Sequence, residues 1–266
     1  MNFTRIKHIF QLNIFKTIIF NLVFFKLKDA IKFPVLIWGG FKIASYKGKI
    51  NPLVPIKTGM LKLGISDPVR SYAQKSYFKL EGTLNIGKNI IIRRGMRIHI
   101  EATSNVTLEN NVTLGVAITI ISKNNIKIRQ ATSVGNNTTF MDTDFHYIIN
   151  TETKKIKNNT SPIIIGENNW IGGWCIVKKG TITPKGTIIA GPFSMVSKDY
   201  TSIIPEYSLI GGSPAKLIQQ NLRRVNNIKN EHILSDWFKN HKEYICESEI
   251  ENFCFTVFSG VKRKSR

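Results

Sequence analysis

The hydrophobic positions in the middle of the chain recur at every sixth residue. Three early runs keep this step: Leu80, Ile86, Ile92 and Ile98, then Leu108, Leu114 and Ile120, then Ile128, Val134 and Phe140. From residue 165 the step continues, with Thr183 as the exception, at Ile165, Ile171, Val177, Ile189 and Met195. A period of six fits neither a helix nor a simple amphipathic strand. It favours a parallel β-helix, in which short strands alternate with tight turns and apolar side chains fill a narrow interior.

The extent of this pattern divides the chain into three parts. The repeats cover residues 80–218 and predict an all-β domain, since the irregularly spaced hairpin turns of an open sandwich are absent. Slips of register between these runs mark loops or bulges. Residues 1–79 form an N-terminal extension, and residues 219–266 form a C-terminal tail that we expect to be helical.

Positive charge is concentrated in the N-terminal extension. The formal net charge is +21, and residues 1–79 hold 14 Lys and Arg against 2 Asp and Glu. The extension is also apolar, yet its longest uncharged run, Thr17 to Phe25, is shorter than the about 20 residues that span a bilayer. Two readings stay open: a subdomain packed on the main body, or a surface lying on the anionic inner face of a bacterial membrane. A nucleic-acid partner is not expected, because no binding motif accompanies the charge.

The cysteines and histidines restrict the chemistry. Three cysteines, Cys175, Cys246 and Cys254, are few and odd in number, which argues against a disulfide framework and for a reducing compartment. We therefore expect a cytoplasmic protein. No set of histidines is spaced to hold zinc, and no metal is expected.

The stretch MDTDFH, residues 141–146, interrupts the repeats with charged groups. Asp142, Asp144 and His146 alternate, so in an extended segment their side chains project to one side. Of the two histidines within the repeats, His146 follows two carboxylates, whereas His99 lies within a coil and is expected to face outward as a neutral residue. The two carboxylates could orient the imidazole or bind hydroxyl groups of a substrate. The alternative is that they only solvate the loop or cap its turn.

The sequence resembles the hexapeptide-repeat acyltransferases. The run PIIIGENNWIGGWCIVKKGTITPKGTIIAGPFSMVSKD, followed by LIGGSPAKLI, looks like the last coils of that superfamily. MDTDFH and the N-terminal KTIIFNLVFFKLKDAIKFPVLI look more narrowly like its members that O-acetylate capsular, exopolysaccharide or O-antigen sugars. The resemblance implies a left-handed parallel β-helix, a homotrimer, and acetyl-CoA bound in grooves between neighbouring β-helices.

The resemblance also assigns roles to single residues. It implies that Tyr147 to Thr160 form an excursion before the repeat resumes at Pro162. It also implies that His146 is the general base, a task that suits an imidazole at neutral pH. Asp144 and Asp142 would orient this base or bind the acceptor, and the Gly173 N–H would stabilise the oxyanion. Trp170 would line the pantetheine channel near the acceptor, unless it is an ordinary exterior aromatic. The remaining predicted cofactor contacts are Gly172, Ala190, Gly191, Lys198 and Lys216. Pro192-Phe193 replaces small residues in a segment one residue longer than the usual pattern, so a bulge is expected there.

These residues together predict an O-acetyltransferase that moves an acetyl group directly from acetyl-CoA to a saccharide hydroxyl of a bacterial surface polysaccharide. No Ser or Cys is placed to form an acyl-enzyme, because Cys175 is expected in the interior. One alternative is an N-acyltransferase acting on an amino-sugar nucleotide, which would use the same base. A weaker alternative is a non-catalytic β-helical scaffold, which the presence of the excursion disfavours.

Overall fold

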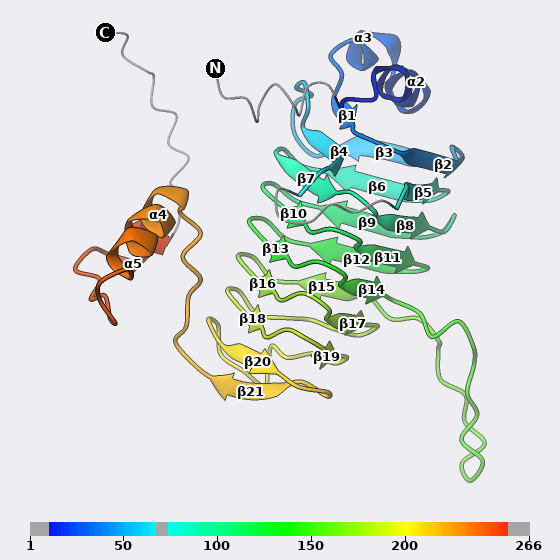
Figure 1. The fold of residues 1–266 in the computed structure, drawn as a ribbon. Helices are drawn as coiled ribbons and strands as arrows, with labels where there is room; N and C mark the ends of the chain where they lie inside the picture. Colours follow the sequence, from blue (N-terminus) through cyan, green and yellow to red (C-terminus); the bar gives the residue numbers. More distant parts are fainter. Residues whose placement is uncertain (1–10, 68–73, 255–266) are drawn as a thin grey trace, which may run out of the picture. The chain divides into compact units, whose positions relative to one another are not determined.

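A computed structural model of the chain describes residues 11–67 and 74–254. Residues 1–10 and 68–73 of the predicted extension and residues 255–266 of the predicted tail lie outside the described residues. The chain forms two compact units, Met1–Asn221 and Leu222–Arg266. The first unit is a stack of coils, each of which passes through up to three sheets (Figure 1).

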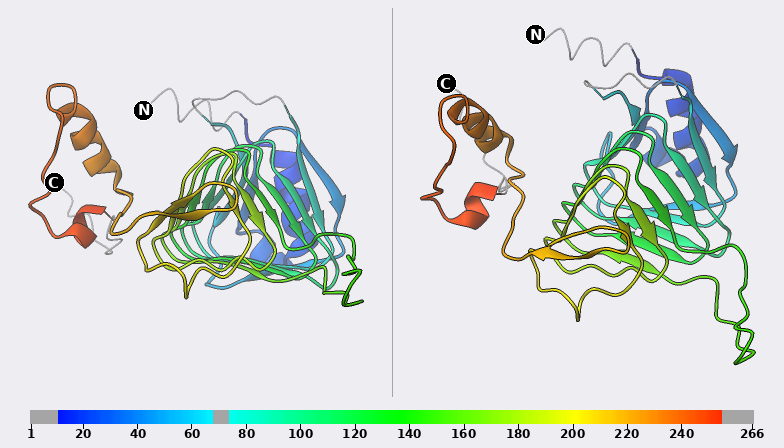
Figure 2. Two further views of the ribbon diagram at one scale, coloured as in Figure 1. Left: turned by 90° about the horizontal axis from the view of Figure 1, so that it is seen from below. Right: turned by 60° about the horizontal axis from the view of Figure 1, so that its bottom comes forward.

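Three sheets form the sides of this stack, which is three-sided when viewed end-on (Figure 2). The nine-stranded sheet contains, in order, β1 (Val35–Ile37), β4 (Leu61–Ile65), β7 (Ile90–Arg93), β10 (Thr113–Leu114), β13 (Ser133–Val134), β16 (Trp170–Ile171), β18 (Ile188–Ile189), β20 (Leu209–Gly211) and β21 (Lys216–Gln219). The seven-stranded sheet contains β2 (Phe41–Ser45), β5 (Ser76–Leu80), β8 (Arg97–Ile100), β11 (Thr119–Ser122), β14 (Thr139–Met141), β17 (Ile176–Lys178) and β19 (Met195–Val196). The five-stranded sheet contains β3 (Lys49–Pro52), β6 (Thr83–Ile86), β9 (Asn105–Leu108), β12 (Asn125–Ile128) and β15 (Ile163–Ile165).

Parallel pairing places equivalent residues of successive coils directly above one another. One interior column of the nine-stranded sheet runs through Ile92, Leu114, Val134, Ile171, Ile189 and Ile210. All of these side chains are buried, and full burial of such a side chain is worth about 1.5–3 kcal/mol. Only β21 departs from the parallel pattern, because it pairs antiparallel with β20. The parallel β-helix predicted from the six-residue repeats is confirmed, in the left-handed form that the resemblance implied.

The β-helix begins earlier than the sequence predicted. Strands β1 to β4 already belong to the three sheets, so the first coil starts at Val35 and not at residue 80. The early coils escaped the pattern because their corners differ in length and aromatic side chains fill their interior. Phe41 and Phe78, for example, are both buried, with ring centroids 6.1 Å apart.

Two short helices, α2 (Ile14–Phe24) and α3 (Leu27–Ala30), lie at the β1 end of the stack (Figure 1). Phe20 of α2 is fully buried against Phe41 and Phe78. The Asn21 amide donates to Val35 O over 2.7 Å and accepts from Val35 N over 3.1 Å. These contacts satisfy backbone groups of β1 that would otherwise form an open sheet edge. The reading of a subdomain packed on the main body is therefore correct for this face of α2.

The opposite side of the two helices exposes large apolar residues. They are Ile14, Phe15, Ile18, Leu22, Val23, Leu27 and Ile31. Within the described part of the chain, no helix is both long enough and apolar enough to cross a bilayer. The extension thus packs on the β-helix through one side of α2. Its other side leaves an apolar surface of the kind that contact with a membrane would require.

The second unit holds two helices, α4 (Ile228–Trp237) and α5 (Ile250–Cys254). Its boundary at Leu222 lies close to the predicted start of the tail at residue 219. Aromatic contacts link its segments: Trp237 stacks on His241 with centroids 3.9 Å apart, and Tyr244 stacks on Phe253 at 5.8 Å. The tail is helical in these two segments, and the described residues between them form turns and loops.

Candidate active site

The excursion leaves the β-helix between β14 and β15 and projects as a long arm (Figure 1). Its two limbs are bridged in antiparallel fashion at Thr143 and Thr160 and again at Ile149 and Ile156. Asn150 closes the outer turn, since its side-chain oxygen accepts from the backbone N–H groups of Glu152 and Thr153. The excursion therefore has defined local structure and includes the predicted segment 147–160.

Asp142 anchors the base of this arm. Its side chain is completely buried and accepts hydrogen bonds from Ser122 Oγ at 2.8 Å, Lys123 N at 2.7 Å and Asn124 N at 3.0 Å. The expectation that all three polar side chains project to one side is wrong for Asp142, because the chain turns out of the sheet at this position. Its carboxylate is turned into the corner of the stack, so the contact with an acceptor expected of Asp142 is not supported.

Asp144 is bound to two lysines of the following coil. Lys179 Nζ lies 2.8 Å from Asp144 Oδ2, and Lys178 Nζ lies 3.6 Å from Oδ1. The hydrogen bond from Lys179, with the charges of both lysines, lowers the pKa of the Asp144 carboxyl group below its usual value. The backbone N–H of His146 donates to Asp144 O over 2.7 Å. Both carboxylate oxygens thus face lysines, and the side-chain contact with the imidazole that an orienting role needs is not formed among the described residues.

His146 is exposed and lines a cavity of about 740 Å³. The cavity is also lined by Asp144 at the base of the arm, by Lys179 of the following coil, and by these residues of the arm: Ile148, Ile149, Asn150, Thr151, Thr153, Lys155, Lys157, Asn158 and Asn159. This volume lies within the range typical of small-molecule sites. An imidazole at the wall of such a cavity can take a proton from a bound hydroxyl group.

A second, apolar groove of about 580 Å³ lies on the outside of the last coils. It unites five residues that the sequence assigned to the cofactor and acceptor, namely Trp170, Gly172, Gly173, Ala190 and Gly191. Successive coils approach closely here: a Cβ atom at Gly172 would lie 2.4 Å from Gly191 N. The groove therefore has a floor of bare backbone. Among the described residues, the Gly173 N–H donates no hydrogen bond.

The two lysines predicted to contact the cofactor do not line this groove. Lys198 is exposed and holds its ammonium group 5.4 Å from the ring centroid of Tyr200. Lys216 is exposed at the start of β21. Neither side chain lines the groove within one chain.

The predicted extra residue near Pro192 lies in a corner of the β-helix. Five residues separate β18 from β19, whereas four separate β13 from β14. The insertion moves the interior position from Met195 to Val196, which is buried and pairs with Val177. The assignment of Met195 to the interior column is thus wrong by one residue. The corner residues Trp174 and Phe193 both have positive φ, at 61° and 66°, and their rings lie 6.4 Å apart.

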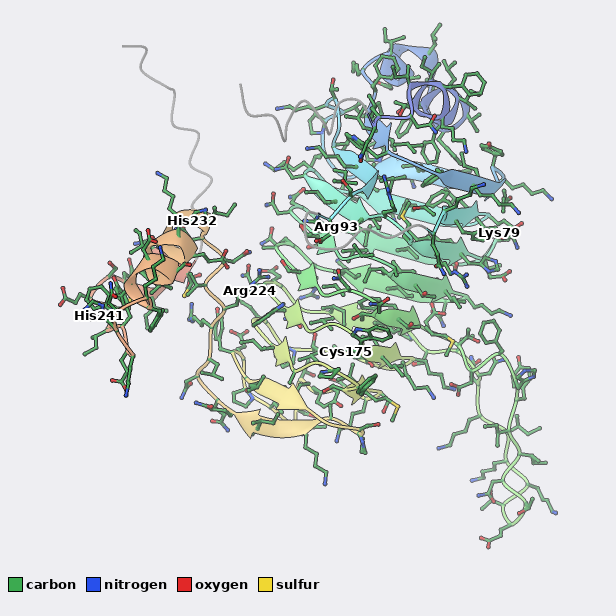
Figure 3. All side chains as sticks on the ribbon, in the orientation of Figure 1. Lys79, Arg93, Cys175, Arg224, His232 and His241 are labelled. Atoms are coloured by element: carbon green, nitrogen blue, oxygen red, sulfur yellow. The ribbon has the colours of Figure 1, made fainter. Side chains whose placement is uncertain are left out.

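The cavity and the groove occupy different corners of the stack. The His146 arm leaves between the seven-stranded and five-stranded sheets, whereas the corner of Gly173 joins the nine-stranded and seven-stranded sheets. Cys175 follows this second corner and is buried inside the β-helix (Figure 3). Burial raises the pKa of its thiol, so its position and its protonation both oppose a role as nucleophile.

A further polar cluster escaped the sequence analysis. Glu81, His99 and Glu101 place their ligand atoms within 4.8 Å of one another on the outside of the early coils. Burial, with the nearby charge of Lys79, lowers the pKa of His99, which agrees with its expected neutral state. Lys79 Nζ already lies 2.9 Å from Glu81 Oε2 and supplies a positive charge to the cluster. The cluster is formed across coils, so only the stacking of β5 on β8 reveals it.

No protein-family model matches the chain. Its sequence is 24% identical over 152 residues to an Escherichia coli (strain K12) protein named as a lipopolysaccharide biosynthesis O-acetyl transferase, WbbJ; the match covers 54% of this chain and 75% of that protein. It is 37% identical over 75 residues to a Staphylococcus aureus (strain COL) protein named as an acetyltransferase, SACOL2570, and covers 28% of this chain and 33% of that protein.

Two solved structures of acetyltransferases are similar in fold. The polysialic acid O-acetyltransferase OatWY is 17% identical with a TM-score of 0.49, and covers 80% of this chain and 96% of that chain. The polySia specific acetyltransferase NeuO is 21% identical with a TM-score of 0.48, and covers 76% and 93%. The two sequence relatives and the two solved structures thus all carry the name of acetyltransferases.

Replacement of Asp142 should destabilise the protein even though this residue touches no cavity. Asp142→Ala leaves a buried hydroxyl group and two backbone N–H groups without their acceptor, and we expect a loss of about 2–4 kcal/mol in the free energy of unfolding. Asp144→Ala removes only a partly exposed ion pair and should cost about 0–1 kcal/mol. Denaturant unfolding of both variants measures the difference, and equal stabilities would contradict the anchoring role.

Proposed function

We propose that this β-helical chain moves an acetyl group from acetyl-CoA to a hydroxyl group of a bacterial surface-polysaccharide sugar. Its sequence relatives bear the names of acetyltransferases. The acceptor would belong to a capsule, an exopolysaccharide or an O-antigen. The observation that carries this proposal is a histidine on the wall of a polar cavity of about 740 Å³, in a molecule that also bears an apolar groove floored by glycine backbone. The first feature suits a sugar hydroxyl, and the second suits a thin pantetheine chain.

In the proposed reaction, the imidazole of His146 accepts the proton of the attacking hydroxyl group. The hydroxyl oxygen bonds to the thioester carbonyl carbon, and the Gly173 N–H donates to the oxyanion of the tetrahedral intermediate. The carbon–sulfur bond then breaks, and the departing CoA sulfur recovers a proton from the imidazolium. Transfer is direct, because the interior Cys175 cannot reach either substrate.

Asp144 takes a different part from the one the sequence suggested. Its carboxylate holds Lys179, and Lys179 Nζ also donates to Asn158 O over 2.9 Å. This chain of contacts ties the return limb of the arm to the β-helix. We infer that Asp144 positions the arm, and with it the cavity beside His146, and does not act on the imidazole itself.

A homotrimer would complete the site. Within one chain the His146 cavity and the Gly173 groove lie at different corners, so a proton acceptor and an oxyanion donor do not meet. Cyclic packing of identical β-helices places the corner of one chain against a different corner of the next. The arm of one chain would then reach the groove of its neighbour.

Peripheral contact with the inner membrane face is proposed for the exposed side of α2 and α3. Phe15, Leu22 and Leu27 are exposed there, beside Lys26 and Lys28. Apolar side chains mixed with lysines suit a surface that lies on anionic lipid. Such contact would hold the enzyme near a lipid-linked glycan.

The first test of the catalytic proposal is His146→Ala. Loss of one positioned base should lower kcat by ~10²–10⁴, with little change in the KM for acetyl-CoA, because the imidazole lies on the acceptor side. Acetyl transfer is measured against surface glycans and, in parallel, amino-sugar nucleotides, which would reveal N-acylation instead. His99→Ala removes a half-buried histidine that does not line the cavity and serves as the control. Near-normal turnover in a folded His146→Ala protein would refute the assignment.

The trimer and its shared site can be tested by complementation. Sedimentation should show a trimer, and Ala190→Trp should inactivate it by filling the groove. Co-assembly of His146→Ala chains with Ala190→Trp chains should restore activity, to about a quarter of normal for random mixing, because some sites receive an intact arm and an intact groove. An inactive mixture, or an active monomer, would show that each chain contains a whole site.

Membrane contact is tested by flotation with anionic vesicles. Each basic residue near the surface contributes ~1 kcal/mol, so recovery should fall steeply as salt rises. The double variant Phe15→Glu, Leu22→Glu changes only exposed side chains and should abolish flotation while leaving Phe20 in place. Ile233→Glu, at an exposed apolar position of α4, serves as control. Equal recovery of both proteins would exclude this surface.

A further inference from the structure

The cavity beside His146 carries an excess of positive charge. Its lining includes Lys155, Lys157 and Lys179 against a single carboxylate, Asp144. Lys179 and Asp144 neutralise one another at 2.8 Å. Lys155 and Lys157 are exposed, and neither forms an ion pair within residues 11–67 and 74–254. Two lysines without an ion-pair partner in these ranges therefore line the space in which the proposed acceptor would bind.

The remaining lining is neutral and suits a carbohydrate. Asn150, Thr151, Thr153, Asn158 and Asn159 supply amide and hydroxyl groups, and Ile148 and Ile149 supply an apolar wall. Some of these polar groups already shape the arm; Asn159 Nδ2, for example, donates to Phe145 O over 3.2 Å. A neutral sugar would satisfy the amides and hydroxyls but would leave the two lysines without a counter-charge.

We propose that the acceptor is an anionic saccharide whose carboxylate or phosphate is bound by Lys155 and Lys157. This inference rests on the proposed function and names its substrate class. Charges of one sign that line a cavity attract ligands of the opposite sign and speed their arrival. An ammonium group binds either anion as a point charge, through charge-assisted hydrogen bonds. The anion would sit on the arm while a hydroxyl group of the same or the next sugar faces His146.

The arm itself provides a matched control. Lys154 is the immediate neighbour of Lys155 and is equally exposed, yet it does not line the cavity and has positive φ, at 57°. A general effect of charge on the arm would involve all three lysines alike. Specific binding of an anion in the cavity requires Lys155 and Lys157 only.

The experiment compares acidic and neutral acceptors in the full-length enzyme. The probes are sialic-acid and hexuronic-acid oligosaccharides, the carboxyl-reduced form of each, and neutral oligosaccharides with and without a phosphodiester. We expect kcat/KM to be about tenfold or more higher for an anionic probe than for its neutral partner. The double variant Lys155→Gln, Lys157→Gln should lose this preference, because the KM for the anionic acceptor rises. Its kcat and its KM for acetyl-CoA should stay unchanged. Lys154→Gln should behave as wild type. Preference for the phosphodiester over the carboxylate would identify the anion as phosphate.

Binding to the non-reacting His146→Ala protein supplies a readout that does not depend on turnover. Calorimetric affinity for the anionic probes should weaken about tenfold in the double lysine variant, since each exposed charge pair contributes a few-fold, and should fall with added salt. Equal transfer to acidic and neutral probes, or an unchanged preference in the double variant, would overturn this inference and leave the proposed function standing. Acidic probes that bind with the expected lysine dependence but are never acetylated would overturn the proposed function instead.

Discussion

Stacking of aliphatic side chains in a fixed register is the constraint on which the rest of the molecule depends. Each strand is only a few residues long, so it gains little from its own length and is held by the coils above and below it. The column from Ile92 to Ile210 shows the result, because every coil supplies one buried side chain at the same place. Any insertion must therefore leave and re-enter the stack without moving this register.

The base of the His146 arm shows how such an insertion is accommodated. Ile126 of β12 pairs directly with Ile163 of β15, as if the intervening excursion were absent. Asp142 makes this continuity permissible, because its buried carboxylate accepts from groups of the coil before it. A buried charge is tolerated only with such hydrogen bonds. The proposed chemistry can then be carried by an arm that the core does not need.

The fixed register of the stack also determines where the groove, the helical cover and the exposed charges lie. Residues at the corners can adopt positive φ, and the backbones of successive coils approach closely there. The groove of Gly172, Gly173 and Gly191 forms at such a corner. The β1 end of the stack needs a cover, and α2 provides it through Phe20 and Asn21. Lysines, which the apolar interior cannot hold, lie exposed on the arm and on the outer face of the helices. The stack is thus separate from the arm and from the N-terminal helices, both in the chain and in space.

The sequence by itself determined the parallel β-helix, because a repeat of six reports stacking that is local to the chain. The excursion and the residues around the groove were assigned from motifs that resemble those of known acyltransferases. The repeat did not reveal the first coils, since Phe41 and Phe78 and corners of other lengths hide the period there. Only the tertiary structure showed that Asp142 turns inward and that Asp144 meets Lys178 and Lys179 from the following coil. It alone separated the His146 cavity from the Gly173 groove. Contacts between coils depend on how many residues each corner and excursion contains, and that number is fixed by packing in three dimensions.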